Sequence, residues 1–120
     1  AGEIFLTSIE NEGTGHGYQT EILDKIQNYV DIPLIIYGGA KNKHDVLKVL
    51  SDYNLVDGVC ISSMLHYSYL ANEEISNFNN IQGNLEFLKN KNDTSNNKFE
   101  KICIYNLKKF LYTNQIDVRF

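Results

Sequence analysis

Three segments of the chain are continuous apolar runs, and each is followed by a stretch of different character. The runs cover residues 4–9, 33–37 and 56–63. Apolar runs without strict alternation are typical of parallel strands that are buried on both faces of a sheet. The pattern therefore predicts three parallel β-strands, each covered on both sides.

Apolar residues recur at helical spacing in the two intervals between these runs. In the first interval Thr20 is the predicted N-cap, and the apolar stripe extends from Ile22 to Val30. In the second interval Asn42 is the predicted cap, and Asp45 stands where a capping box requires an acidic residue. Strands that alternate with helices indicate an α/β fold with βαβ units. This rhythm suits either a closed barrel or a doubly wound sheet.

Residues 72–98 have a different composition, because asparagine crowds this stretch together with lysine and aspartate. Such a segment buries little apolar surface, so we predict a surface loop with a short helical turn at residues 83–88. A helix is predicted over residues 104–113. The chain is thus expected to form one domain, with βα units in 1–71, an insertion loop in 72–98, and a C-terminal helix and tail in 99–120. Because a strand follows Ala1 almost at once, we expect a piece of a longer protein.

The charge and the reactive side chains narrow the possible functions. The net charge is −4 and no basic stripe is visible, which argues against nucleic-acid binding. No apolar run approaches the roughly 20 residues of a membrane span. Cys60 and Cys103 lie in apolar settings and are predicted to be buried, reduced thiols. The cysteines and histidines lack metal-ligand spacing, so we expect neither a metal nor another cofactor.

Small and hydroxylated residues follow each predicted strand, where its carboxyl end would lie. In parallel α/β folds the ligand site is found at these ends. Glycines let backbone N–H groups approach a phosphate closely, and hydroxyl groups donate further hydrogen bonds. Each glycine alone is explained as well by a tight turn, but three clusters in register favour phosphate binding. The predicted phosphate-binding residues are Gly13, Thr14, Gly38, Gly39, Ser62 and Ser63.

The same segments resemble the cyclase subunit family of imidazole glycerol phosphate synthase. Residues 1–9 with Glu12-Gly13-Thr14 are similar to the family's sixth strand and loop, G-E-I-L-L-T-S-I-D-x-D-G-T. Residues 32–40 resemble its seventh strand, I-P-V-I-A-S-G-G-A. Residues 56–67 resemble its eighth strand, and residues 107–111 and 118–119 its last helix and terminal V-R. The resemblance covers about residues 1–70 and 104–120.

This resemblance implies the C-terminal portion of a TIM (β/α)8 barrel, about strands 6–8 of a chain of about 250 residues. The family's cyclase uses ammonia from a glutaminase partner on a phosphoribulosyl aminoimidazole carboxamide substrate, in histidine biosynthesis and in the cytoplasm. Its two principal catalytic aspartates lie on strands one and five, outside this chain, so the fragment alone is expected to be inactive. Glu12 corresponds to a supporting carboxylate beside the substrate. Glu3 corresponds to a charged residue at the opposite end of the barrel that helps to gate ammonia.

Several positions depart from the family pattern. Glu10 and Glu12 replace two aspartates, Tyr37 stands where a serine or another small residue is usual, and Lys41 replaces a glycine. A bulky Tyr37 is expected to narrow the pocket, and Lys41 to add positive charge near it. The insertion at 72–98 resembles cyclase paralogues that serve surface-polysaccharide sugar amidotransferases. That paralogue, or a non-catalytic phosphate-binding barrel fragment, is the alternative interpretation.

Overall fold

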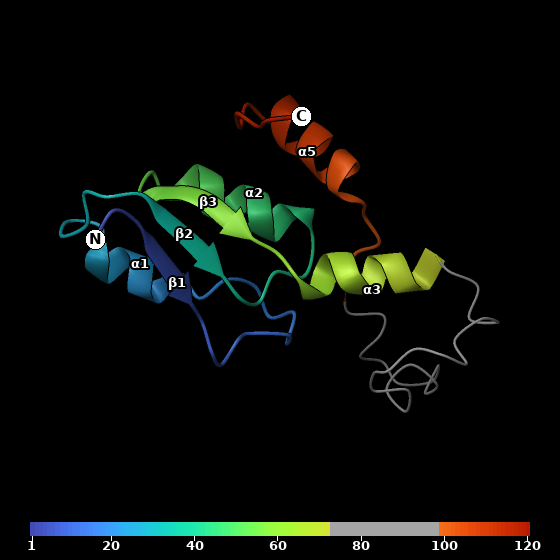
Figure 1. Ribbon diagram of the computed structural model, residues 1–120, viewed down its shortest axis with the longest axis horizontal. Coiled ribbons are helices and arrows are strands. Elements are labelled where there is room, and N and C mark those ends of the chain that lie inside the picture. Colours follow the sequence, from blue (N-terminus) through green and yellow to red (C-terminus); the bar gives the residue numbers. More distant parts are fainter. Residues whose placement is uncertain (73–98) are drawn as a thin grey trace.

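The structure is a computed structural model that describes residues 1–72 and 99–120 (Figure 1). The loop and the helical turn predicted between these ranges lie outside the described residues. Strands and helices alternate along the first range, which confirms the predicted α/β class with parallel strands. The elements in order are β1 (Ile4–Thr7), α1 (Glu21–Ile26), β2 (Leu34–Tyr37), α2 (Lys43–Asp52), β3 (Val56–Cys60), α3 (Ser63–Asn72) and α5 (Ile104–Thr113).

The three strands form one parallel sheet in the order β1-β2-β3. The pairing of β2 with β3 is irregular, because Leu34 pairs with Val56 while Ile35 pairs with Gly58. Asp57 is therefore an extra residue, as in a β-bulge. Its Oδ2 atom accepts a hydrogen bond of 3.0 Å from the Leu34 N–H. A side chain thus supplies an acceptor at the point where the ladder is interrupted.

One face of this sheet is buried against α1 and α2. Leu34 and Ile36 of β2 lie in a core cluster with Leu23 of α1 and Val49 of α2. On the opposite face, the Phe5 side chain is 54% exposed, and Ile35 and Tyr37 are only half-buried. The prediction of strands covered on both faces is therefore wrong for the described residues, since their helices cover one face.

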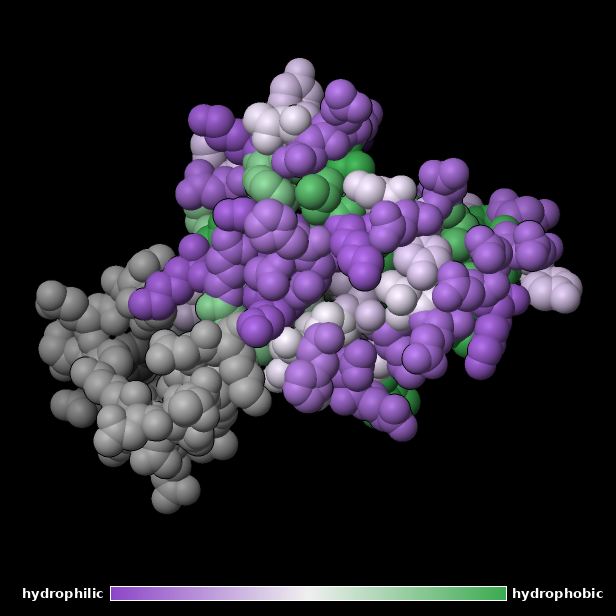
Figure 2. Space-filling view, turned by 180° about the vertical axis from the view of Figure 1, so that it is seen from behind, coloured by the Kyte–Doolittle hydropathy of each residue, from purple (hydrophilic) through white to green (hydrophobic). Residues whose placement is uncertain are grey.

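A second core cluster joins the C-terminal segment to α2 and α3. It brings Leu107 and Leu111 of α5 against Val46 of α2 and Met64 of α3. Ile102, which precedes α5, is buried in the same cluster. Seen from behind, hydrophobic side chains gather beneath α5, whereas most of that face is hydrophilic (Figure 2). These apolar contacts hold α5 beside α2 (Figure 1).

The two predicted helix caps differ in the structure. The Asn42 side chain accepts hydrogen bonds from the N–H groups of His44 and Asp45, at 2.8 and 3.0 Å. The Asp45 carboxylate accepts from the Asn42 N–H in return, which confirms the capping box. Thr20 occupies the N-cap position of α1, but its side chain makes no capping hydrogen bond. Helix α1 is also shorter than predicted, since it ends at Ile26 and leaves Tyr29 86% exposed.

Two further expectations about local structure are wrong. The third apolar run was predicted to remain a strand as far as Ser63, but β3 ends at Cys60 and Ser63 is the first residue of α3. Cys103 is exposed rather than buried, because it is the N-cap residue of α5 and its side chain lies outside the core. Cys60 is half-buried, and both cysteines are free.

The described residues were also compared with the requirements for a membrane-spanning helix and for a metal site. Within residues 1–72 and 99–120, no helix combines the length and apolar character needed to cross a bilayer. In the same ranges, no three histidine, cysteine, aspartate or glutamate side chains gather in a way that could hold a metal ion.

Candidate functional site

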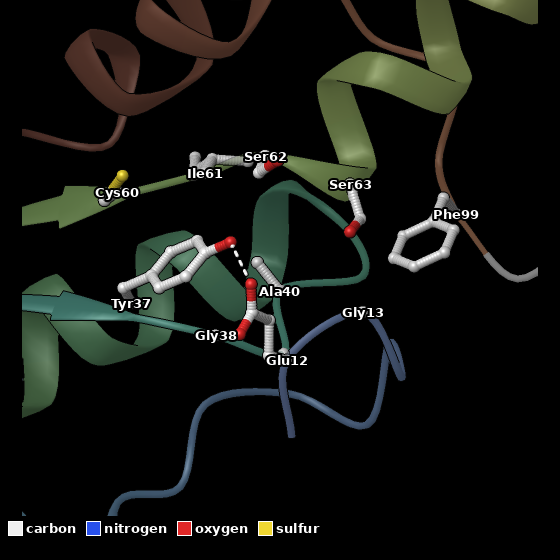
Figure 3. A pocket seen from close by; sticks show the side chains of 11 residues that line it. Glu12, Gly13, Tyr37, Gly38, Ala40, Cys60, Ile61, Ser62, Ser63 and Phe99 are labelled. Carbon is white, nitrogen blue, oxygen red and sulfur yellow. Dashed lines mark hydrogen bonds between the residues drawn. The ribbon is translucent and has the colours of Figure 1, made fainter. Parts of the chain in front are cut away.

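The ends of β2 and β3, the loop after β1 and the segments after β2 and β3 meet around one small pocket (Figure 3). Because the strands are parallel, the segments that follow them leave the same edge of the sheet. Six of the residues predicted from the sequence come together here, and they are Glu12, Gly13, Gly38, Gly39, Ser62 and Ser63. The remaining lining residues are Tyr37, Ala40, Cys60, Ile61 and Phe99.

The other two predicted residues do not line this pocket. The Thr14 hydroxyl donates a hydrogen bond of 2.8 Å to the Asn11 carbonyl and accepts one from the His16 N–H. Thr14 thus holds the loop after β1 in shape. Glu3 is exposed and directly precedes β1, at the amino end of the sheet. The structure therefore places Glu3 and the pocket at opposite ends of the strands.

Two of the pocket glycines are required by close packing of the backbone. Gly38 and Gly39 have φ angles of 103° and 101°, which side chains of L-residues rarely tolerate. A Cβ atom on Gly38 would lie 2.8 Å from the Ser8 carbonyl oxygen, and one on Gly39 would lie 2.1 Å from that of Gly17. The Gly17 N–H also donates to the Gly39 carbonyl at 2.8 Å. Backbone packing alone therefore requires glycine at both positions, independently of any role in ligand binding.

Gly13 and Ser63 face each other across the pocket without such crowding. Gly13 has a φ angle of 72°, and a Cβ atom placed on it would have the Ser63 Oγ as its nearest neighbour, at 3.9 Å. Ser63 is also the first residue of the ten-residue helix α3. Free N–H groups and a positive partial charge gather at a helix N-terminus and favour anions. The Ser63 hydroxyl and the N-terminus of α3 thus lie opposite Gly13, with open space between them.

Glu12 and Tyr37 make a direct hydrogen bond within the pocket (Figure 3). The Tyr37 hydroxyl donates to the Glu12 Oε1 atom at 2.8 Å. This hydrogen bond is the largest cause that raises the pKa of Tyr37 above its ordinary value of 10.0, while the Ser62 hydroxyl acts in the opposite sense. Tyr37 therefore remains a neutral hydrogen-bond donor at ordinary pH.

A second tyrosine, Tyr18, contacts the backbone of a residue that lines the pocket. The Tyr18 hydroxyl lies 3.5 Å from the Cys60 carbonyl oxygen, to which it donates. Burial is the main cause that raises the pKa of Tyr18, and the negative charges that Cys60 and Asp45 can carry add to it. Tyr18 is consequently a neutral residue that packs against both core clusters.

The pocket is nearly filled by its own side chains. Its cavity volume is about 10 Å³, which is room for about one water molecule. Tyr37 crosses it from the end of β2, and the Phe99 ring borders it on the side of Ser63 (Figure 3). A phosphate group therefore requires these side chains to move.

Phe99 is a pocket residue that the sequence did not indicate. Its ring stacks on Tyr67 with a centroid distance of 5.2 Å. It would also lie 3.3 Å from a Cβ atom placed on Gly15. No motif contains Phe99, and the residue is separated from the strand-end clusters by the Asn-rich segment. Only the fold brings it to the site.

Glu100, the residue after Phe99, connects this side of the pocket to the start of α2. Its carboxylate accepts a hydrogen bond of 2.7 Å from the Lys43 N–H and forms a 2.8 Å salt bridge with the Lys43 ammonium group. Its own N–H donates to the Lys41 carbonyl at 2.9 Å. Burial would raise the pKa of Glu100, but the hydrogen bonds from Lys43 outweigh it and the net pKa lies below the ordinary 4.5. Folding thus favours the charged carboxylate.

The Glu100–Lys43 pair predicts a defined dependence of stability on pH. Because folding lowers the pKa of Glu100, its contribution is present above the unfolded value of 4.5 and is lost as pH falls through the folded value. We expect Glu100→Gln to lower the free energy of unfolding by about 1 kcal/mol at pH 7. The difference from wild type should shrink below pH 4.5. Urea denaturation at pH 7 and pH 3.5 measures it, with exposed Glu10→Gln as the control. An equal difference at both pH values would contradict the assignment.

The chain is similar to a protein family and to several known proteins. Residues 1–71 match the family described as "Histidine biosynthesis protein". The chain is 37% identical over 78 residues to "Imidazole glycerol phosphate synthase subunit HisF" of Prochlorococcus marinus (strain AS9601), which covers 65% of this chain and 30% of that protein. It is 37% identical over 86 residues to the subunit of the same name from Clostridium botulinum (strain 657 / Type Ba4), with coverage of 69% and 32%.

The chain thus spans about a third of the length of the curated relatives that it matches. The family match covers all three strands and the strand-end residues of the pocket up to Ser63. On these grounds the chain belongs to the histidine biosynthesis protein family.

Proposed function

We propose that this chain is part of the cyclase subunit of imidazole glycerol phosphate synthase and supplies its phosphate-holding end. The observation that carries the proposal is the meeting of six predicted residues at the carboxyl edge of a parallel sheet. Ser63 and the N-terminus of α3 provide donors for phosphate oxygens, and Gly13 leaves room beside them. The ligand is accordingly a phosphorylated small molecule.

In this proposal the described strands correspond to strands 6–8 of a TIM barrel. Both outer strands border hollows, of about 240 Å³ beside β1 and about 390 Å³ between β3 and α5. These are the positions that neighbouring βα units occupy in a closed barrel. The uncovered face with Phe5 and Tyr37 would then point to the barrel interior. Residues 1–71 and 99–120 form one domain, with residues 72–98 as an insertion.

The family resemblance implies which residues take part in catalysis and which lie outside this chain. The principal aspartates belong to strands one and five, so we expect the chain by itself to be inactive. Glu12 acts as a supporting carboxylate beside the substrate, and Glu3 guards the opposite end, where ammonia from a glutaminase partner enters. The position of Glu3 at the amino end of β1 supports this arrangement. The pathway implies a cytoplasmic protein.

The departures from the family pattern left a polysaccharide-linked paralogue open as an alternative. The curated relatives carry the name of the histidine-pathway subunit, which supports the cyclase over that alternative. We therefore interpret Glu10, Glu12 and Lys41 as variation within the cyclase family.

A chimera tests the proposal. Residues 1–71 would replace the matching segment of the Prochlorococcus marinus subunit, and ammonium-dependent release of imidazole glycerol phosphate would be measured. We expect turnover, and Ser63→Ala in the chimera should raise KM about tenfold because it removes a phosphate donor. Ser51→Ala on the exposed side of α2 is the matched control. A folded chimera without turnover would refute the cyclase assignment.

A further inference from the structure

Glu12 is exposed and places its carboxylate on the wall of a pocket that otherwise suits an anion. It lines the cavity together with Gly39 and Ser63. A carboxylate on this wall repels an incoming phosphate, because charges of the same sign repel each other. One of the residues that line the pocket is therefore unfavourable for an anionic ligand.

Tyr37 holds this carboxylate in place. Its hydroxyl donates to Glu12 at 2.8 Å, and its ring lies against Phe5 with a centroid distance of 6.0 Å. The side chain starts at the last residue of β2 and reaches across to the loop after β1 (Figure 3). With this contact made, the cavity volume is about 10 Å³, which is smaller than a phosphate group requires.

We propose that the Tyr37–Glu12 pair closes the phosphate pocket and determines which ligands enter it. This inference rests on the proposed phosphate site. A phosphate group enters only when the hydrogen bond opens and the Tyr37 ring moves away. The pair thus weakens the binding of simple anions, and it admits a phosphorylated ligand whose remaining groups offset the lost contact. Tyr37 is a specificity-determining residue in this scheme, and Glu12 is its partner.

The electrostatics of the pair fit this closed arrangement. The pKa of Tyr37 is raised mainly by its hydrogen bond to Glu12. A raised pKa keeps the phenol protonated, so the donor persists throughout the ordinary pH range. The pair does not open by titration of the tyrosine near neutral pH, and a ligand has to displace it.

Binding of inorganic phosphate to the full chain tests the proposal. Phosphorus NMR titration would compare wild type with Tyr37→Ser, Tyr37→Phe and Glu12→Gln. We expect Tyr37→Ser and Glu12→Gln to bind inorganic phosphate about tenfold more tightly, with a smaller gain for Tyr37→Phe, which keeps the ring. Tyr29→Ser and Tyr29→Phe are matched controls, because Tyr29 is 86% exposed and lies outside the pocket. These two should bind as wild type does.

The outcomes separate this inference from the proposed phosphate site. Equal affinity in wild type and all three pocket variants would overturn the closing pair while leaving the site intact. No binding by any of these proteins would overturn both. Circular dichroism checks folding, and if Tyr37→Ser is unfolded, Tyr37→Phe and Glu12→Gln decide the result. A second readout is the ultraviolet titration of Tyr37, obtained as wild type minus Tyr37→Phe. Its pKa should fall in a Glu12→Gln background, and an unchanged pKa would show that the hydrogen bond is absent in solution.

Discussion

Replacing Gly39 by alanine is expected to lower the free energy of unfolding by about 3 kcal/mol or more. The added Cβ atom would lie 2.1 Å from the Gly17 carbonyl oxygen, which is backbone and cannot rotate away. The φ angle of 101° adds strain for any residue with a side chain. Domains of this size are stable by only about 5–15 kcal/mol, so a large share of the total is lost. Urea denaturation followed by circular dichroism measures the effect.

Two other glycines provide the controls for this prediction. Gly2→Ala should be neutral, because no heavy atom lies within 4 Å of its added Cβ. Gly13→Ala should cost about 1 kcal/mol, because the φ angle is positive but the space is open. Similar losses in all three variants would contradict the packing argument.

Leu107→Ala is expected to lower the free energy of unfolding by about 2–5 kcal/mol. Leu107 is 2% exposed and packs in the cluster that joins α5 to α2 and α3. Truncation removes its buried methyl groups and leaves a cavity that the helices fill only partly. The same urea experiment measures the loss, and the transition should remain a single one because α5 packs in the same core cluster as α2 and α3.

Tyr112→Ala on the same helix is the matched control. Its side chain is 62% exposed, and a surface substitution of this kind changes stability by only about 0.5 kcal/mol. If Leu107→Ala behaved like Tyr112→Ala, then α5 would not be packed on the rest of the domain in solution.

The sequence predicts those parts of the fold whose pattern is local. The three apolar runs locate β1, β2 and β3, and the spacing of Asn42 and Asp45 predicts a capping box that the structure contains. The strand-end residues could be predicted as a group because parallel strands end at one edge. Six of the eight candidate site residues meet in one pocket for this reason.

The remaining features depend on contacts that no local pattern reveals. Helix α3 has apolar and aromatic residues on several sides, so its periodicity is weak and the sequence does not indicate where the preceding strand ends. Ile9 continues the first apolar run, yet it is 85% exposed because the chain turns after Ser8, whose carbonyl accepts from the Glu12 N–H. Cys103 shares its apolar surroundings with a buried Ile102, but only the latter faces the core. Apolar neighbours in sequence therefore do not establish burial.

The extra residue in β3, Asp57, determines which side chains of that strand face the helices and which face the opposite side of the sheet. Val56 and Val59 both pack toward the helices although they are three residues apart, because Asp57 is left out of the pairing. In an unbroken ladder, Tyr37 would pair with Val59, and Cys60 would be turned toward the core. With the bulge, Tyr37 pairs with Cys60, and both line the pocket. One residue at the amino end of β3 thus determines which chemical groups the strand presents at its other end, three residues before α3 begins.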